Sequence, residues 1–171
     1  MQNILTAIVD NDNDNLLEAF VKDMDVTEST TDSSSKQDAE DAILSYAIKR
    51  SSPGCLELLV KRSLSTDIES DSLVRTTDQD VYSSATLAAT LGEATALGVI
   101  LRTDPRVETI DRDQLEKLIH VSARSGAEGS SECLRLLLEE YKMDIEERNS
   151  KDETPLLVAA LGELEVQTWS A

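Results

Sequence analysis

The chain has 171 residues and a formal charge of -18, because 34 acidic residues outnumber 16 basic ones. A protein this acidic is not expected to bind nucleic acid or an anionic membrane, although a basic protein partner stays open. One histidine and two separate cysteines, Cys55 and Cys133, exclude most metal sites and most nucleophilic active sites. We therefore expect no cofactor, no bound metal and no enzymatic activity.

The sequence carries neither a membrane segment nor a secretion signal that we can identify. No apolar run reaches the roughly 18 to 20 residues that a bilayer span requires. The first residues, MQNILTAIVDNDND, have no basic region and no long apolar region. We expect a soluble protein of the cytoplasm or nucleus, with a single domain over 1–171 that is a monomer on its own.

The run DNDNDN at 10–15 has two interpretations. Its alternating oxygen-bearing side chains are similar to a calcium-binding loop, but the glycine and the glutamate that such a loop needs at its sixth and twelfth positions are missing. The interpretation that we favour is a turn between two helices, in which Asn or Asp caps the helix that begins at LLEAFV.

Apolar residues then recur at helical spacing, in pairs of short segments. The clearest pairs are AILSYAIKR with CLELLVKR (42–50 and 55–62) and LEKLIHVSAR with SECLRLLLEEY (115–124 and 131–141). Each helix is too short to be stable alone, so the helices must pack on one another. The fold class that this pattern predicts is all-α.

Two polar stretches separate the early helices. VTESTTDSSSKQDAED (26–41) has too few apolar residues to offset the entropy of ordering, so we predict a flexible acidic loop there. STDIESDSLVRTTDQD (65–80) is predicted to be a second polar loop, partly docked through its few apolar residues. Ser29, Ser35 and Thr66 each have an acidic residue three positions later, a context that acid-directed kinases favour.

Small or apolar residue pairs recur 34 to 41 residues apart and mark an internal repeat. The pairs are Ala7-Ile8, Ala47-Ile48, Ala88-Ala89, Ser122-Ala123 and Ala159-Ala160. These periods are somewhat longer than the repeat length of about 33 residues that is known for ankyrin repeats, and the excess falls in the polar stretches and in the GAEGSS turn at 126–131. The alternative is a series of unrelated helical hairpins.

The segment MDIEERNSKDETPLLVAA (143–160) resembles the ankyrin-repeat family. The residues that match the family pattern are Asp144, Thr154, Pro155, Leu156, Ala159 and Ala160. His120 aligns with the family histidine, which implies a hydrogen bond across the hairpin between repeats. Departures are Asp152, where the family favours Gly, and a Thr-Pro pair that occurs only once. The resemblance implies an ankyrin-like solenoid of about five stacked helix-turn-helix units with hairpin loops.

Other helical solenoids, of HEAT-like or tetratricopeptide type, are the alternative folds, and the hairpin signal at 144–155 argues against both. The chain ends at GELEVQTWSA (162–171) without a second helix or a polar cap for the last unit. Two explanations stay open. Trp169 could fold back over the last layer, or the chain could be a piece of a longer protein.

The function that we predict is a non-catalytic protein-protein interaction module, an adaptor or scaffold. The family resemblance implies that the partner meets the hairpin tips. The candidate residues there are Arg106, Glu108, Asp111 and Arg112 on one tip and Glu146, Arg148, Lys151 and Asp152 on the next. A sharper version is an escort for a basic client of ribosomal or histone type. The alternative is a regulatory or targeting fragment of a larger protein, which could be an enzyme.

The two cysteines are predicted to be reduced and buried. They are expected at the same position in the second helices of units two and four, so about two helix layers separate them. A disulfide requires α-carbons about 4.4 to 6.8 Å apart. Free cysteine behaves as a small apolar side chain, so a structural role is expected for both.

Overall fold

The computed structural model describes residues 2–27, 33–69, 78–104, 107 and 112–168. This part of the chain contains helices and no strand, so the predicted all-α class is confirmed. The helices are α1 (Gln2–Asp10), α2 (Asp14–Thr27), α3 (Ser33–Arg50), α4 (Pro53–Glu69), α5 (Asp78–Leu91), α6 (Ala94–Thr103), α7 (Arg112–Ser125), α8 (Ser130–Glu139) and α9 (Pro155–Thr168).

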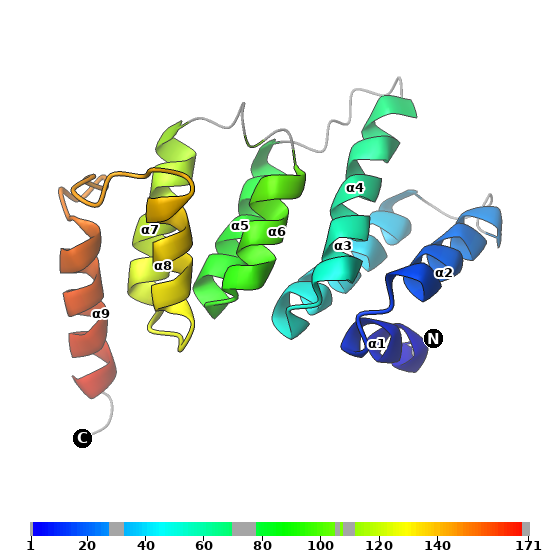
Figure 1. Cartoon of the computed structure of the whole chain (residues 1–171), viewed down its shortest axis with the longest axis horizontal. Coiled ribbons are helices and arrows are strands. Elements are labelled where there is room, and N and C mark those ends of the chain that lie inside the picture. Colours follow the sequence, from blue (N-terminus) through cyan, green and yellow to red (C-terminus); the bar gives the residue numbers. More distant parts are fainter. Residues whose placement is uncertain (1, 28–32, 70–77, 105–106, 108–111, 169–171) are drawn as a thin grey trace.

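The helices form a row of antiparallel pairs in two layers (Figure 1). Along one layer, each odd-numbered helix from α1 to α9 packs on the next odd-numbered helix. Along the other, each even-numbered helix from α2 to α8 packs on the next even-numbered helix. We call α1–α2, α3–α4, α5–α6 and α7–α8 units 1 to 4, and α9 begins unit 5. Contacts therefore join neighbours in the row.

Three of the turns inside the units have the same backbone geometry. One residue in each turn has a positive φ: Asp12 (47°), Ser51 (51°) and Gly92 (72°). The next residue donates its N–H to a carbonyl five residues earlier: Asn13 to Ile8, Ser52 to Ala47 and Glu93 to Ala88. This is the Schellman ending of a helix, which satisfies the last carbonyls of α1, α3 and α5. Repetition of one turn makes units 1 to 3 equivalent in the structure.

The turn geometry corrects one register in the sequence repeat. The carbonyls that accept in unit 2 belong to Ala47 and Ile48, whereas those in unit 1 belong to Ile8 and Val9. Both Ile8 and Val9 are buried, while Ala7 is exposed. The predicted pair Ala7-Ile8 is therefore wrong by one residue, and the pair equivalent to Ala47-Ile48 is Ile8-Val9. The sequence alignment matched the exposed Ala7 to the buried Ala47 because both are alanine.

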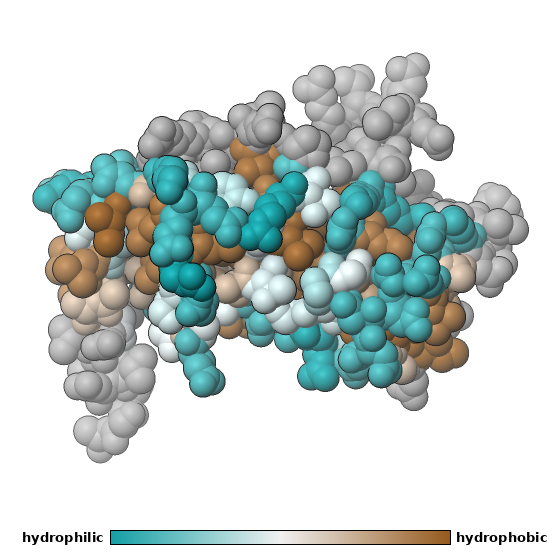
Figure 2. Space-filling model, viewed as in Figure 1, coloured by the Kyte–Doolittle hydropathy of each residue, from teal (hydrophilic) through white to brown (hydrophobic). Residues whose placement is uncertain are grey.

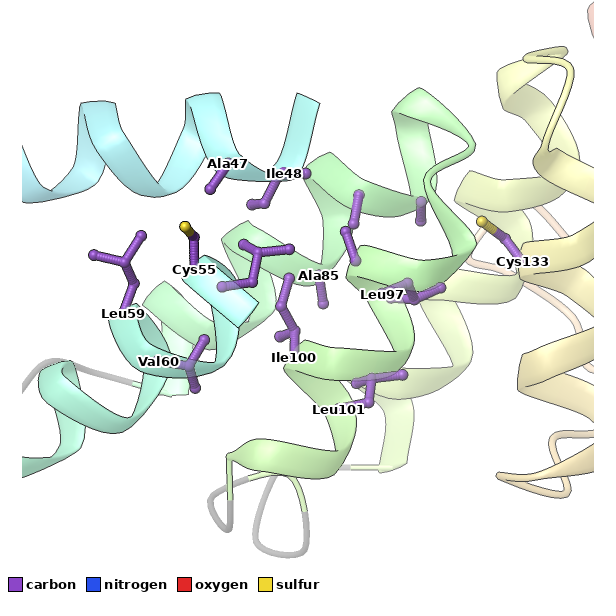
Figure 3. Packing of buried hydrophobic residues seen from close by; sticks show 14 of the residues in the cluster. Ala47, Ile48, Cys55, Leu59, Val60, Ala85, Leu97, Ile100, Leu101 and Cys133 are labelled. Carbon is purple, nitrogen blue, oxygen red and sulfur yellow. The ribbon is translucent and has the colours of Figure 1, made fainter. Parts of the chain in front are cut away.

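A continuous apolar core runs along the row between the two layers. The second helices supply the same stripe of buried residues: Cys55, Leu56, Leu59 and Val60 in α4, and Ala96, Leu97, Ile100 and Leu101 in α6 (Figure 3). The first helices face them with small residues such as Ala47, Ala88 and Ala89, which let the helices approach closely. Burial of each large side chain contributes about 1.5 to 3 kcal/mol.

Polar contacts join unit 1 to unit 2 at their turns. The carboxylate of Asp12 accepts hydrogen bonds from the N–H groups of Gly54 (3.2 Å) and Cys55 (3.0 Å), at the start of α4. The buried hydroxyl of Ser52 donates to the carbonyl of Val9 at 2.7 Å. Since the first N–H groups of a helix have no partner within it, the Asp12 side chain caps a helix of the following unit.

We predict that Asp12→Ala lowers the free energy of unfolding by about 1 kcal/mol, because two N–H groups of α4 lose their acceptor. Urea unfolding followed by circular dichroism measures the loss. Asp12→Asn is the control, since it keeps an acceptor oxygen and tolerates a positive φ. If Asp12→Asn is as unstable as Asp12→Ala, the lost cap is not the cause.

The loop predicted across 26–41 is wrong at both ends. Helix α2 extends to Thr27 and α3 begins at Ser33, so only 28–32 lie outside the described residues. Helix α4 likewise reaches Glu69 and α5 begins at Asp78, which shortens the predicted loop at 65–80. Once part of a helix is fixed by packing, extending it through residues with high helix propensity costs little free energy. Such residues, namely Lys, Gln, Ala and Glu, are frequent between 36 and 40.

Of the three predicted phosphorylation sites, Ser35 lies in α3 and Thr66 lies in α4, and Ser29 lies outside the described residues. Trp169, which was predicted as a possible cover for the last layer, also lies outside the described residues.

Candidate protein-interaction surface

The structure describes five of the eight predicted partner-binding residues. In Figure 1 the connection between α8 and α9 lies along one edge of the row, and the turn between α7 and α8 lies along the other. Arg106, Glu108 and Asp111 lie outside the described residues, and Arg112 is the first residue of α7. The second predicted set, Glu146, Arg148, Lys151 and Asp152, is exposed and lies together in the loop between α8 and α9. We call residues 144–154 the tip loop.

Asn149 holds the tip loop in a tight hairpin. Its side-chain oxygen accepts the N–H groups of Lys151 (2.9 Å) and Glu153 (3.0 Å), and its amide nitrogen donates to the Glu153 carboxylate at 2.9 Å. The backbone closes the same hairpin, since Asn149 donates its N–H to the Glu153 carbonyl at 3.1 Å. Asp152 sits at the tip with a φ of 63°, which the glycine of the family pattern would adopt more readily.

Sequence reasoning did not identify Asn149 as the organiser of this loop. The signal was present, because Asn followed by a polar stretch is the residue that forms local side-chain to backbone turns. Asn149 fits this role, because its side chain fixes the backbone of the loop while the neighbouring side chains stay in solvent.

Two of the four predicted contact residues in the tip loop bind each other. Arg148 Nη1 donates to the Asp152 carbonyl at 2.9 Å and lies 3.3 Å from the Asp152 carboxylate. Their side chains are 58% and 83% exposed. Ion pairs this exposed contribute about 0 to 1 kcal/mol, so a partner can replace the pair at little cost. Glu146 and Lys151 form no ion pair with any residue of the described ranges.

His120 fixes the tip loop to α7. Its Nε2 lies 3.1 Å from the carbonyl oxygen of Glu153, and because a carbonyl only accepts, Nε2 is the donor. Next along the chain, the Thr154 hydroxyl accepts the Leu157 N–H at 3.4 Å, and Pro155 begins α9. The hydrogen bond that the family resemblance implied for His120 is present.

A groove between α2 and α4 is the second surface feature, and the sequence did not predict it. Its volume is about 480 Å³. The residues that line it are Asp14, Glu18, Val21 and Lys22 of α2 and Gly54, Glu57, Leu58, Lys61 and Arg62 of α4. Asp12, in the turn just before α2, binds the first residues of α4, and the two helices diverge towards their C-terminal ends (Figure 1). This divergence opens the groove.

The rim of this groove carries charge pairs at matching positions on both helices. Lys22 Nζ lies 2.6 Å from Glu18, and Lys61 Nζ lies 2.5 Å from Glu57. The two pairs belong to the segments LEAFVK (17–22) and LELLVK (56–61), which align once unit 1 has its correct register. The rim is therefore close to neutral, unlike the chain as a whole.

The acidic run at 10–15 is occupied by structural contacts. The side-chain oxygen of Asn13 accepts the Leu16 N–H at 3.0 Å, which caps α2 and confirms the interpretation of this run as a turn. Asp10 accepts hydrogen bonds from Tyr46 (2.9 Å) and Arg50 (2.7 Å), and the bond to Asp10 raises the pKa of Tyr46. Within the described ranges, no group of His, Cys, Asp and Glu could hold a metal ion.

Both cysteines are free and fully buried, as predicted. They do not share a position, because Cys55 is the third residue of α4 and Cys133 is the fourth residue of α8. Counted from the first residue of each helix, the predicted equivalence is therefore off by one residue. Figure 3 shows the two thiols on opposite sides of α6.

Burial raises the pKa of each thiol from 9.0 to about 11. We predict that neither cysteine reacts with a thiol reagent at pH 8 until the protein unfolds, because the reactive thiolate is scarce and covered. Reagent absorbance in native and urea-unfolded protein measures this. Because the native pKa is raised, the free energy of unfolding should also fall as pH rises from 9 through 11. Fast reaction of native protein would contradict the burial of both residues.

The described helices contain no stretch with the length and apolar character that a membrane crossing requires. In comparisons with family models, curated proteins and solved structures, the chain matches none of them.

Proposed function

We propose that the chain is an ankyrin-like solenoid that acts as a non-catalytic protein-interaction module. One observation carries the proposal: helix pairs pack in a row with neighbour-to-neighbour contacts in both layers, so the surface that they form is extended. The repeated Schellman turn, the Thr154-Pro155 helix start and the bond from His120 to the tip loop support the ankyrin-like version.

The tip loop is the surface that we propose for partner contact. Its backbone is fixed by Asn149 and His120, so binding does not require the loop to be ordered first. Glu146 and Asp152 extend from this rigid loop into solvent. Rigid loops with exposed charged side chains are well suited to recognition.

The partner that we propose is a basic protein. A charge of -18 produces a negative field that accelerates encounter with a cationic surface and repels nucleic acid. An escort for a basic client fits this charge, as does an adaptor for a basic domain. Both versions require the affinity to fall as salt screens the field.

Binding to purified core histones, used as a defined basic probe, tests the proposal. Affinity is measured by biolayer interferometry from about 50 mM to about 500 mM salt, around the range where screening becomes short-ranged. We expect binding that weakens steadily with salt, and no binding to double-stranded DNA. Glu146→Lys should weaken binding about three- to tenfold, as expected for a contact worth about 1 kcal/mol.

Glu128→Lys is the matched control, because Glu128 is also an exposed glutamate and lies in the turn between α7 and α8, on the opposite edge of the row. It makes the same charge change away from the tip loop. Equal loss in the two variants would show that net charge, and not the tip loop, carries binding. No binding to histones at low salt would contradict the basic partner.

A further inference from the structure

Among the residues whose side-chain exposure the structure describes, the exposed large apolar ones lie in the end units of the row and in the loop that leads to the last of them. They are Ile4 (58% exposed) and Leu16 (51%) in unit 1, and Ile145 (53%), Leu156 (76%), Leu157 (46%) and Leu161 (42%) around α9. Figure 2 shows apolar surface reaching both ends of the row. Concentrated apolar surface of this kind marks interaction sites.

Leu16 occupies a position that is buried in units 2 and 3. It is the third residue of α2, and the third residues of α4 and α6 are Cys55 and Ala96, both 0% exposed. The turn of the preceding unit covers the start of α4, since Asp12 binds the N–H of Cys55. Leu16 therefore faces the place that a preceding unit would take.

At the other end of the row, Leu156 of α9 is likewise exposed at a helix position that is buried in other units. It lies three residues before the small pair that begins at Ala159, and the residues three before the equivalent pairs in α5 and α7 are Ala85 and Ile119. Ala85 is 1% exposed and Ile119 is 0% exposed. The same helix position is thus buried in α5 and α7, partly buried at Leu44 in α3, and exposed in α9.

We propose that these two ends bind each other in separate copies of the chain, so that α9 of one copy stacks on unit 1 of the next. The contact continues the packing between neighbouring units that the row already contains. Such a contact is heterologous, because each copy offers two different faces. Segment 155–162 of α9, PLLVAALG, has no charged residue, so no charge there loses its hydration on stacking.

The net charge gives this association a distinct salt dependence. Two copies with a charge of -18 repel each other, so added salt should strengthen stacking by screening the repulsion. Binding of a basic partner has the opposite dependence. The stacking proposal does not rest on the proposed function, and the two can fail separately. It replaces the sequence-based expectation of a monomer.

Sedimentation velocity of the full chain tests the stacking. We expect the weight-average sedimentation coefficient to rise with protein concentration, and to rise further between about 50 mM and about 500 mM salt. A monomer at all concentrations and salts would overturn the proposal.

Two variants separate head-to-tail stacking from any symmetric contact. Leu156→Asp blocks the α9 face and Ile4→Asp blocks the unit 1 face. Both residues are exposed, so the fold should persist, which circular dichroism checks. Each variant alone should stay monomeric. An equimolar mixture should form a complex of two chains and no larger species, because the intact α9 of one variant fits the intact unit 1 of the other.

The remaining outcomes count against the proposal. If Ile4→Asp alone associates like the unchanged chain, the contact is between two α9 faces. If Leu156→Asp alone associates, α9 is not involved. If the mixture stays monomeric, the two ends do not recognise each other. Leu16→Asp and Leu157→Asp repeat the test should either first variant fail to fold.

Discussion

Leu97→Asp should lower the free energy of unfolding by about 4 kcal/mol or more. Leu97 is 0% exposed in the middle of α6, within the core that joins unit 3 to its neighbours (Figure 3). Aspartate there would bury a charge without a partner or take a proton at a cost in free energy. Since domains are stable by about 5 to 15 kcal/mol, this variant should be largely unfolded in mild urea.

Thr95→Asp is the matched control in the same helix. Thr95 is exposed in the first turn of α6, where an acidic side chain interacts favourably with the helix dipole. Its urea midpoint should match that of the unchanged protein. A comparable loss in both variants would mean that the inside and outside of α6 are assigned wrongly.

Gly129→Ala should lower the free energy of unfolding by about 3 kcal/mol. Gly129 caps α8, and a Cβ added there would overlap the carbonyl oxygen of Gly92 in the turn of unit 3. Gly92 is also confined, although less tightly, since its own Cβ would lie 2.9 Å from the Ala127 Cβ. The turns of units 3 and 4 touch through their backbones, so a single methyl group forces them apart.

Gly126→Ala is the control, and it separates backbone strain from steric overlap. Gly126 has a φ of 59°, but an added Cβ would meet no atom within 4 Å. Its cost should be the strain of the left-handed conformation alone, about 1 kcal/mol. The losses of stability in Gly129→Ala and Gly126→Ala are measured by thermal and urea unfolding. Equal losses would mean that the turns of units 3 and 4 are not in contact.

The all-α class was predictable because the apolar residues of segments such as 55–62 lie on one side only if the segment is a helix. The tip loop was also predictable, since Asp144, Thr154 and Pro155 resemble a known hairpin and helix start. The hydrogen bond between His120 and this loop was predicted from the same alignment. Such features depend on residues that are close together in the sequence.

The features that sequence reasoning missed depend on contacts between distant residues. The polar composition of 33–41 indicated a loop, but the stem at Ile43 and Ala47 is buried and the helix extends back from it. The register of Ile8 and Val9 is fixed by the turn at Asp12. The groove between α2 and α4 is lined by residues 14–22 and 54–62, two segments about 40 residues apart that no local pattern brings together.

Distances between spin labels along the even-numbered helices test the row of units most directly. Ser131 of α8 is paired in turn with Thr95 of α6, Glu57 of α4 and Ala19 of α2, all of which are exposed. The native thiols are buried and should stay unlabelled. With about 10 Å for each helix layer, the three distances should increase in that order, by about 10 Å at each step. Similar distances for all three pairs, as in a bundle around one centre, would contradict the account.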